Sequence, residues 1–256
     1  MRRPPVGLLV AAGLAVAALV VLLLGRALLP SDAGYAVWGT TRSGAPLRWD
    51  PCEPVRFAIN PQQAPPGAVA DLRTALALLA DGSGLDLVLV GSTAERPAVD
   101  RPLTRMTPTG PVWREVLVAW STPAATALPL TPLDRGVAVP VAVRDGDREA
   151  LVTGQVVLNA DRTDLVPGFA DRRDAWGATL VHELGHVLGL AHVDDPTQLM
   201  AADPGAGPIR LGAGDRAGLA AIGRPAGCLD GPDPAAERSG RTLRTPALPL
   251  AGTSED

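Results

Sequence analysis

The sequence predicts a mixed α/β domain of the α+β kind, in which most strands precede the helices along the chain. Two observations support this. Short apolar or alternating runs bounded by Gly, Pro or Asn recur through the first two thirds of the chain, whereas the strongest helical spacing of apolar residues comes later. The chain has 256 residues, 46% apolar and 3% aromatic, which suits one domain with a core of Ala, Val and Leu.

The individual elements follow from local spacing. Residues 55–59 alternate in polarity and stop at Asn60-Pro61, as expected of a strand. Residues 67–79 carry apolar side chains at helical intervals and predict an amphipathic helix. The proline-rich residues 96–111 are expected to be irregular. Further strands are expected at residues 85–90, 116–120, 137–143 and 155–158, and further helices at residues 174–188 and 215–222.

The N-terminus predicts a location outside the cytoplasm. Two arginines precede an uncharged apolar run over residues 6–25, which as a helix spans about 30 Å, the thickness of a bilayer core. This pattern favours a signal anchor with the N-terminus inside and the rest of the chain outside. The small residues around Ala33 offer the alternative of a signal peptide cleaved after that residue. We therefore expect residues 1–33 to be a signal anchor or signal peptide, and the protein to be held at the cell membrane or secreted.

The rest of the chain divides into three parts. Gly- and Thr-rich residues 34–51 predict a linker, residues 52–228 the folded domain, and the Pro-, Ser- and charge-rich residues 229–256 a disordered tail. Cys52 and Cys228 predict one long-range disulfide, with two buried free thiols as the alternative. The net charge of −4, the lack of Lys and the lack of any basic run longer than two residues argue against a nucleic-acid partner.

One motif carries the chemistry. Residues 182–192 read HELGHVLGLAH and include all three histidines of the chain. On a helix, His182 and His186 stand one turn apart and point at a single ion, and the glycine after the helix permits a sharp turn that returns His192 as a third ligand. Three imidazoles suit Zn²⁺ and leave its fourth position open, which is typical of a catalytic site. Glu183 lies about 100° around the helix from His182, beside that open position.

This stretch matches the HExxHxxGxxH signature and resembles the metzincin zinc metallopeptidases, most closely the matrixin branch. Residues 195–200 resemble the Met-turn of that family, which implies that Met200 packs beneath the zinc ligands without binding the ion. Residues 211–223 resemble the C-terminal helix of matrixins, in which an acid at the place of Asp215 ties the helix to the Met-turn backbone. The similarity covers residues 52–228 and implies a mixed twisted sheet with an active-site helix and a C-terminal helix.

The resemblance implies a zinc-dependent endopeptidase that hydrolyses peptide or protein substrates outside the cytoplasm. One zinc ion activates a water molecule, and Glu183 acts as the general base that later returns the proton to the leaving amine. Structural Ca²⁺ bound by Asp and backbone oxygens stays open, with no residue assigned to it. A disulfide between Cys52 and Cys228 is favoured over capping of the zinc by Cys52.

The chain departs from the matrixin pattern in two places. Val193 stands where a typical matrixin has Ser, and Ala201 and Ala202 follow Met200 where an aromatic residue is usual. The resemblance therefore makes no prediction about the shape of the substrate pocket in this chain. In addition, no further histidine remains to bind the second, structural zinc that is common in matrixins.

Three alternatives stay open at this point. A zinc amidase acting on cell-wall peptides uses the same kind of site. A non-catalytic surface binding protein retains a zinc site without turnover, although an intact Glu183 argues against it. In the third alternative, Asp194 or Asp195 is the third ligand in place of His192, as in gluzincins. Mutating His192 separately from the two aspartates distinguishes these ligand sets.

Overall fold

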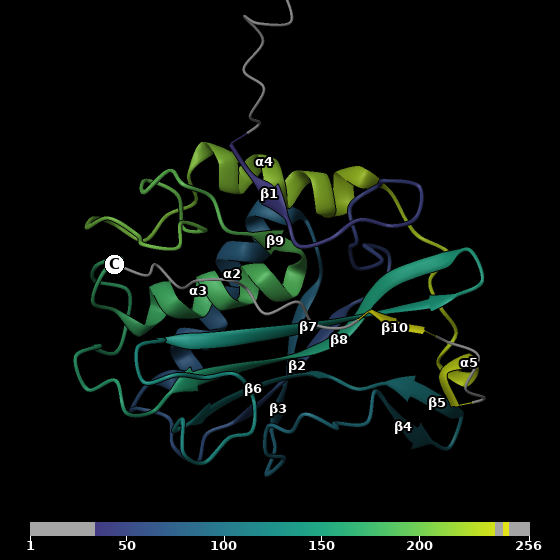
Figure 1. Ribbon diagram of the computed structural model, residues 1–256, viewed down its shortest axis with the longest axis horizontal. Coiled ribbons are helices and arrows are strands. Elements are labelled where there is room, and N and C mark those ends of the chain that lie inside the picture. Colours follow the sequence, from purple (N-terminus) through teal and green to yellow (C-terminus); the bar gives the residue numbers. More distant parts are fainter. Residues whose placement is uncertain (1–33, 239–242, 246–256) are drawn as a thin grey trace, which may run out of the picture. The chain divides into compact units, whose positions relative to one another are not determined.

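The computed structural model describes residues 34–238 and 243–245, and a six-stranded mixed sheet organises them (Figure 1). The strand order is β10-β7-β8-β6-β2-β3. β2, β3, β6 and β8 run parallel to one another, whereas β7 is antiparallel to β8 and β10 is antiparallel to β7. The prediction of a mixed α/β domain is therefore confirmed. The strands are β2 (Val55–Asn60), β3 (Leu87–Ser92), β6 (Val116–Ser121), β7 (Gly136–Asp145), β8 (Arg148–Asn159) and β10 (Leu243–Thr245).

Two helices pack together against the sheet. α2 (Ala68–Ser83) connects β2 to β3, and its apolar residues Leu72, Leu76 and Leu79 are buried. α3 (Trp176–Leu188) packs against β7, β8 and α2, and nearly all of its residues are buried. α4 (Ala213–Ile222) packs against α2 and is followed by η1 (Arg224–Ala226). In Figure 1, α3 lies beside the strand pair β7 and β8, with α4 beyond it.

Residues 93–115 connect β3 to β6, and part of this segment is held by a buried arginine. Arg101 donates to the Glu95 carboxylate, to Thr153 Oγ1 on β8 and to the Glu115 carbonyl. The expectation that residues 96–111 are irregular is wrong in part, because β4 (Thr104–Thr107) and β5 (Gly110–Trp113) form an antiparallel hairpin.

The predicted linker and tail both need correction. Residues 34–51 belong to the folded domain: β1 (Ala36–Val37) pairs with β9 (Leu190–Ala191), and the side chains of Trp38, Leu47 and Trp49 are buried in the core. After residue 228, α5 (Pro234–Arg238) packs against the β4–β5 hairpin, and β10 adds to the sheet. The folded part therefore extends beyond residues 52–228 on both sides. Residues 239–242 and 246–256 lie outside the described residues, so the predicted disorder stays a prediction there.

The disulfide between Cys52 and Cys228 is present, as predicted. It joins residues 176 positions apart, and closing a loop of that length stabilises the folded state by about 5 kcal/mol in the chain-entropy description. Arg48 lies nearby and donates to the carbonyls of Ala226 and Gly227. Residues 48–52 and 226–228 are therefore joined both covalently and by hydrogen bonds.

The apolar run at residues 6–25 and the cleavage position after Ala33 lie outside the described residues. Within the described part of the chain, no helix combines the length and the hydrophobicity needed to cross a membrane. The predicted anchor or signal peptide therefore stays a prediction.

Candidate metal centre

Helix α3 brings two histidines to one face and then stops at a glycine. His182 and His186 are one turn apart, and α3 ends at Gly189, which has a φ of 116° in the left-handed region. The Gly189 N–H donates to the His186 carbonyl, and a Cβ at this position would lie 2.8 Å from the Leu47 carbonyl oxygen. A glycine is required for both reasons. The chain then reverses into β9, which leads directly to His192.

The three imidazoles converge through their Nε2 atoms. The distance from His192 Nε2 is 3.0 Å to His182 Nε2 and 3.1 Å to His186 Nε2, and the last two atoms are 3.1 Å apart. Nitrogens around a tetrahedral ion with bonds of about 2.0–2.1 Å are separated by about 3.3–3.4 Å. The triangle of donor atoms therefore has nearly the size that a bound metal ion requires.

Backbone carbonyls fix the protonation of two of these rings. His182 Nδ1 lies 2.7 Å from the Leu199 carbonyl oxygen, and His186 Nδ1 lies 2.9 Å from the Leu190 carbonyl oxygen. A carbonyl only accepts hydrogen bonds, so each Nδ1 carries the proton and each Nε2 presents a lone pair. Two lone pairs that face each other at 3.1 Å repel one another unless a cation lies between them. This arrangement fits a metal ion and orients its ligands through the outer ring nitrogens.

Burial favours the neutral form of all three histidines. It lowers the pKa of His182 to about 4, lowers that of His186 well below its usual value, and lowers that of His192 as well. The backbone hydrogen bonds to His182 and His186 act in the opposite direction but are the weaker influence. The neutral imidazole is the form that binds a metal ion.

Glu183 is buried between α3 and the beginning of β7. Its residue is 7% exposed, and a Cβ added at Gly136 would lie 3.0 Å from Glu183 Cγ. Burial, with a smaller contribution from the charge of Asp134, raises the pKa of Glu183 to about 8. Gly136 therefore leaves room for this carboxyl group at the beginning of β7.

The loop after His192 packs against α3 and holds the histidines in place. Met200 is 4% exposed, and a Cβ at Gly185 would overlap its Sδ atom, so the glycine between the two helical histidines admits the methionine. The Asp215 carboxylate accepts hydrogen bonds from the backbone N–H groups of Leu199 (2.8 Å) and Met200 (3.2 Å). The contact that the sequence resemblance implies for Asp215 is thus present. It positions the Leu199 carbonyl that binds His182.

No protein-family model matches the chain, and no curated protein matches it in a sequence search. The centre is therefore interpreted from its geometry and its motif.

The alternative third ligands lie outside this donor set. Asp194 and Asp195 are exposed, and the three converging side chains are those of the histidines. Asp195 instead accepts hydrogen bonds from the backbone N–H and the hydroxyl of Thr197 and so shapes the loop. The structure brings His182, His186 and His192 together and leaves both aspartates aside.

Sequence reasoning missed two side chains that hold this loop. Arg172 is buried and donates to the carbonyls of Thr197 and Ala206. Gln198 is buried as well, and its Oε1 accepts a hydrogen bond from the backbone N–H of Asp215. The bonds of Arg172 and the bond from Gln198 Oε1 go to backbone groups 17 or more residues away, and such contacts leave no spacing signal in the sequence.

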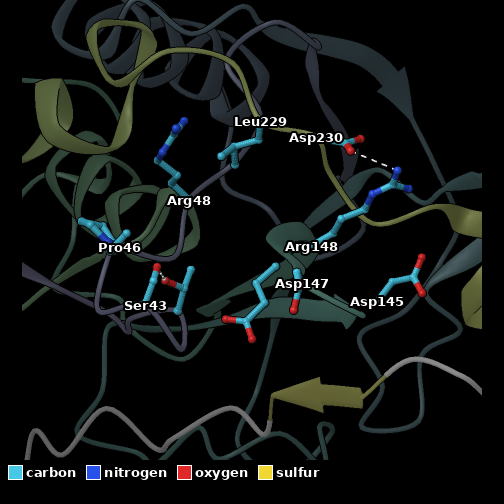
Figure 2. Close-up of a pocket in the computed structure, with 11 residues that line it drawn as sticks. Ser43, Pro46, Arg48, Asp145, Asp147, Arg148, Leu229 and Asp230 are labelled. Atoms are coloured by element: carbon cyan, nitrogen blue, oxygen red, sulfur yellow. Dashed lines mark hydrogen bonds and ion pairs between the residues drawn. The ribbon is translucent and has the colours of Figure 1, made fainter.

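A separate surface pocket of about 610 Å³ lies between the loop at residues 41–48, the β7–β8 turn and residues 229–230 (Figure 2). None of the three histidines lines it. Its lining carries four acids and two arginines, among which Arg148 contacts Asp230 at 3.0 Å, and the lining Glu149 binds Arg144 beside the pocket. This mixture of charges indicates no particular ligand, and we assign none.

Proposed function

We propose that the protein is a zinc-dependent endopeptidase of the metzincin kind, similar to the matrixins, that acts outside the cytoplasm. The observation that carries the proposal is the convergence of three Nε2 atoms within 3.1 Å of one another, two of them with lone pairs fixed by backbone carbonyls. The buried Glu183 next to His182 provides the acid–base group that such a centre needs.

Zinc is the metal that this donor set favours. Three imidazoles suit a borderline ion, and a set of three protein ligands leaves one position for water and substrate. A zinc ion held there supplies Lewis acidity, which polarises a peptide carbonyl and lowers the pKa of a water molecule toward neutrality. Within residues 34–238 no group of three acidic side chains converges, so calcium stays unassigned.

The chain's own residues supply the remaining chemistry. Glu183 accepts a proton from the attacking water and delivers it to the nitrogen of the leaving amine. Glu183 lies beside Gly136, so in this proposal peptide hydrolysis takes place at the beginning of β7. There an extended peptide can pair with the edge of the strand. Met200 and Asp215 keep the Leu199 carbonyl in place, and that carbonyl holds His182 in the tautomer that binds metal.

The substrate class and the location follow from the same proposal. The substrate is a peptide or protein, and the reaction takes place at the outer side of the membrane if residues 6–25 anchor the chain. If the chain is cleaved after Ala33, the enzyme is secreted. The disulfide between Cys52 and Cys228 supports an oxidising compartment in either case.

Zinc content and peptide cleavage by the purified full chain, measured beside two variants, test this function. Glu183→Gln is expected to keep one zinc per chain and to lose cleavage of a mixed peptide pool by at least about a hundredfold, which is the general-base contribution. His192→Ala is expected to lose the zinc, whereas the matched variants Asp194→Asn and Asp195→Asn keep it.

Three results would contradict the proposal. Cleavage retained by Glu183→Gln removes the role of the glutamate. Zinc bound without cleavage of any peptide by the unmodified chain favours the binding-protein alternative. Cleavage confined to cell-wall peptides favours the amidase.

A further inference from the structure

The outer edge of β7 is covered along one part of its length. β10 pairs antiparallel with β7, with Leu243 opposite Arg144, Arg244 opposite Val143 and Thr245 opposite Ala142 (Figure 1). Among the described residues, no strand pairs with the outer edge from Gly136 to Val141. An unpaired strand edge is a template for an additional strand.

The direction of β10 leads along this open edge toward the metal centre. In the observed register the numbers of two facing residues add up to 387, as for Leu243 and Arg144. Continuing the register places residues 246–251 opposite residues 141–136. The last of these is Gly136, which lies against Glu183. The residues that directly follow β10 therefore have the direction and the reach to cover the edge as far as the candidate site.

Backbone orientation agrees with this register. The Arg135 carbonyl accepts from Asn159 N on the β8 side, so Gly136, Ala138 and Pro140 turn their backbone polar groups to the outer edge. Pro140 has no N–H, and an outward position is the one that a proline tolerates in an edge strand. In the continued register, Ala247, Pro249 and Ala251 face this edge, and the nitrogen of Pro246 points away from it. Pro249 has no N–H for the Ala138 carbonyl, so at that pair only the Ala138 N–H donates, to the Pro249 carbonyl.

The C-terminal residues are anchored by α5, and residues 246–251 have a composition that favours an extended strand. α5 packs against β4, β5 and β7, with Ala236 buried and Thr104 Oγ1 donating to Glu237 at 3.3 Å. Residues 246–251, PALPLA, are uncharged, and prolines favour extended backbone in themselves and in the residues before them. Beyond them come Glu255 and Asp256. The continued register places residue 252 opposite Arg135, so these two acids lie beyond the edge of β7.

We propose that the open edge of β7, residues 136–141, is a strand-docking surface whose occupant is the chain's own segment 246–251. This segment extends β10 along the edge and ends beside Glu183. Where the proposed peptidase function holds, docking keeps an extended substrate off the same edge, so the segment inhibits the enzyme from within. The inhibition rests on the proposed function, whereas the docking itself does not.

Hydrogen exchange and peptide cleavage, measured on the full chain and on a variant truncated after Thr245, test the proposal. A tethered segment at an effective concentration of about 1 mM with a Kd of about 0.1 mM occupies its site about nine tenths of the time, so truncation is expected to speed both exchange of the Ala138 amide and cleavage about tenfold. A synthetic peptide of residues 246–256, added at millimolar concentration, is expected to reverse both effects.

Two point variants of the full chain serve if the truncated form fails to fold. Ala247→Pro removes the only hydrogen bond that the 247–140 pair can form, because Pro140 has no N–H of its own, and is expected to act like the truncation. Leu248→Pro is the matched control, because the N–H that it removes points away from β7, and it is expected to leave exchange unchanged.

The outcomes separate the two proposals. Equal exchange of the Ala138 amide in the full chain and in the truncated or Ala247→Pro forms overturns the docking, whatever the activity. Faster exchange without cleavage by any form supports the docking and counts against the peptidase. Faster exchange with unchanged cleavage overturns the inhibition.

Discussion

Replacing Gly185 by alanine tests how closely α3 packs onto Met200. A Cβ at Gly185 would overlap Met200 Sδ and lie 3.2 Å from Met200 Cε. Overpacking of a tight core costs about 1–3 kcal/mol, and the upper part of that range applies because α3 cannot shift without moving His182 and His186. Alanine recovers about 1 kcal/mol through its higher helix propensity. We expect Gly185→Ala to lower the free energy of unfolding by about 1–2 kcal/mol.

The matched background is Met200→Ala, which removes the overlapping sulfur. Alone, this variant is expected to cost about 2–5 kcal/mol, as for a large side chain removed from a core. In that background the Cβ of Gly185→Ala enters free space, and only the gain in helix propensity of about 1 kcal/mol remains. The same substitution therefore destabilises the unmodified protein and stabilises the Met200→Ala variant.

Urea unfolding with the disulfide intact, followed by tryptophan fluorescence, measures this double-mutant cycle. A chelator is present throughout, so that metal binding does not contribute to the unfolding free energy. A coupling energy of about 2–3 kcal/mol between residues 185 and 200 is expected, within the range found for residues in direct contact. If Gly185→Ala has the same sign and size in both backgrounds, the close packing of Gly185 on Met200 is refuted.

Three further predictions follow from contacts around the centre. Asp215→Asn replaces one oxygen that accepts from the Leu199 and Met200 N–H groups by an NH2 donor, so we expect the free energy of unfolding to fall by about 1–3 kcal/mol. Zinc affinity, measured by chelator competition, is expected to be about 10–100-fold weaker, and unchanged affinity would contradict the positioning role. The paired change Cys52→Ser and Cys228→Ser is expected to cost about 3–5 kcal/mol in urea unfolding, and a loss below about 1 kcal/mol would show that the closed loop contributes little. Removing zinc with EDTA is expected to lower stability by about 4 kcal/mol relative to protein in zinc at a thousandfold excess over Kd, measured by calorimetry, and an unchanged transition would count against a bound ion.

Elements with a local signal were predictable from the sequence. The expected strands at residues 55–59 and 116–120 correspond to Val55–Asn60 and Val116–Ser121, because their apolar runs end at breakers or turns. The convergence of the three histidines was predictable for a similar reason. Helical periodicity aligns the first two, and a glycine with positive φ directly after the helix returns the third, all within eleven residues.

Elements held by distant partners were not predictable. Trp49 Nε1 donates to the Val187 carbonyl, 138 positions away, and nothing in the composition of residues 34–51 reports that contact. The hairpin of β4 and β5 contains Pro111 in a short strand, so local propensity argued against it. β10 likewise depends on pairing with β7, which begins about a hundred residues earlier. In each case tertiary contacts decide the structure and local preference does not.

Residues 34–51, which the sequence predicted to be a linker, are part of the framework that holds the metal centre. Trp38 N donates to the Gly189 carbonyl at 2.7 Å, and β1 pairs Val37 with Leu190. Leu190 is also the residue whose carbonyl binds His186 Nδ1. The turn that separates the second histidine from the third is therefore held from outside by residues 36–38, because a two-residue strand such as β9 has too few bonds of its own to fix a ligand. The spacing of the motif brings His192 back toward α3, and the β1–β9 pairing keeps it there.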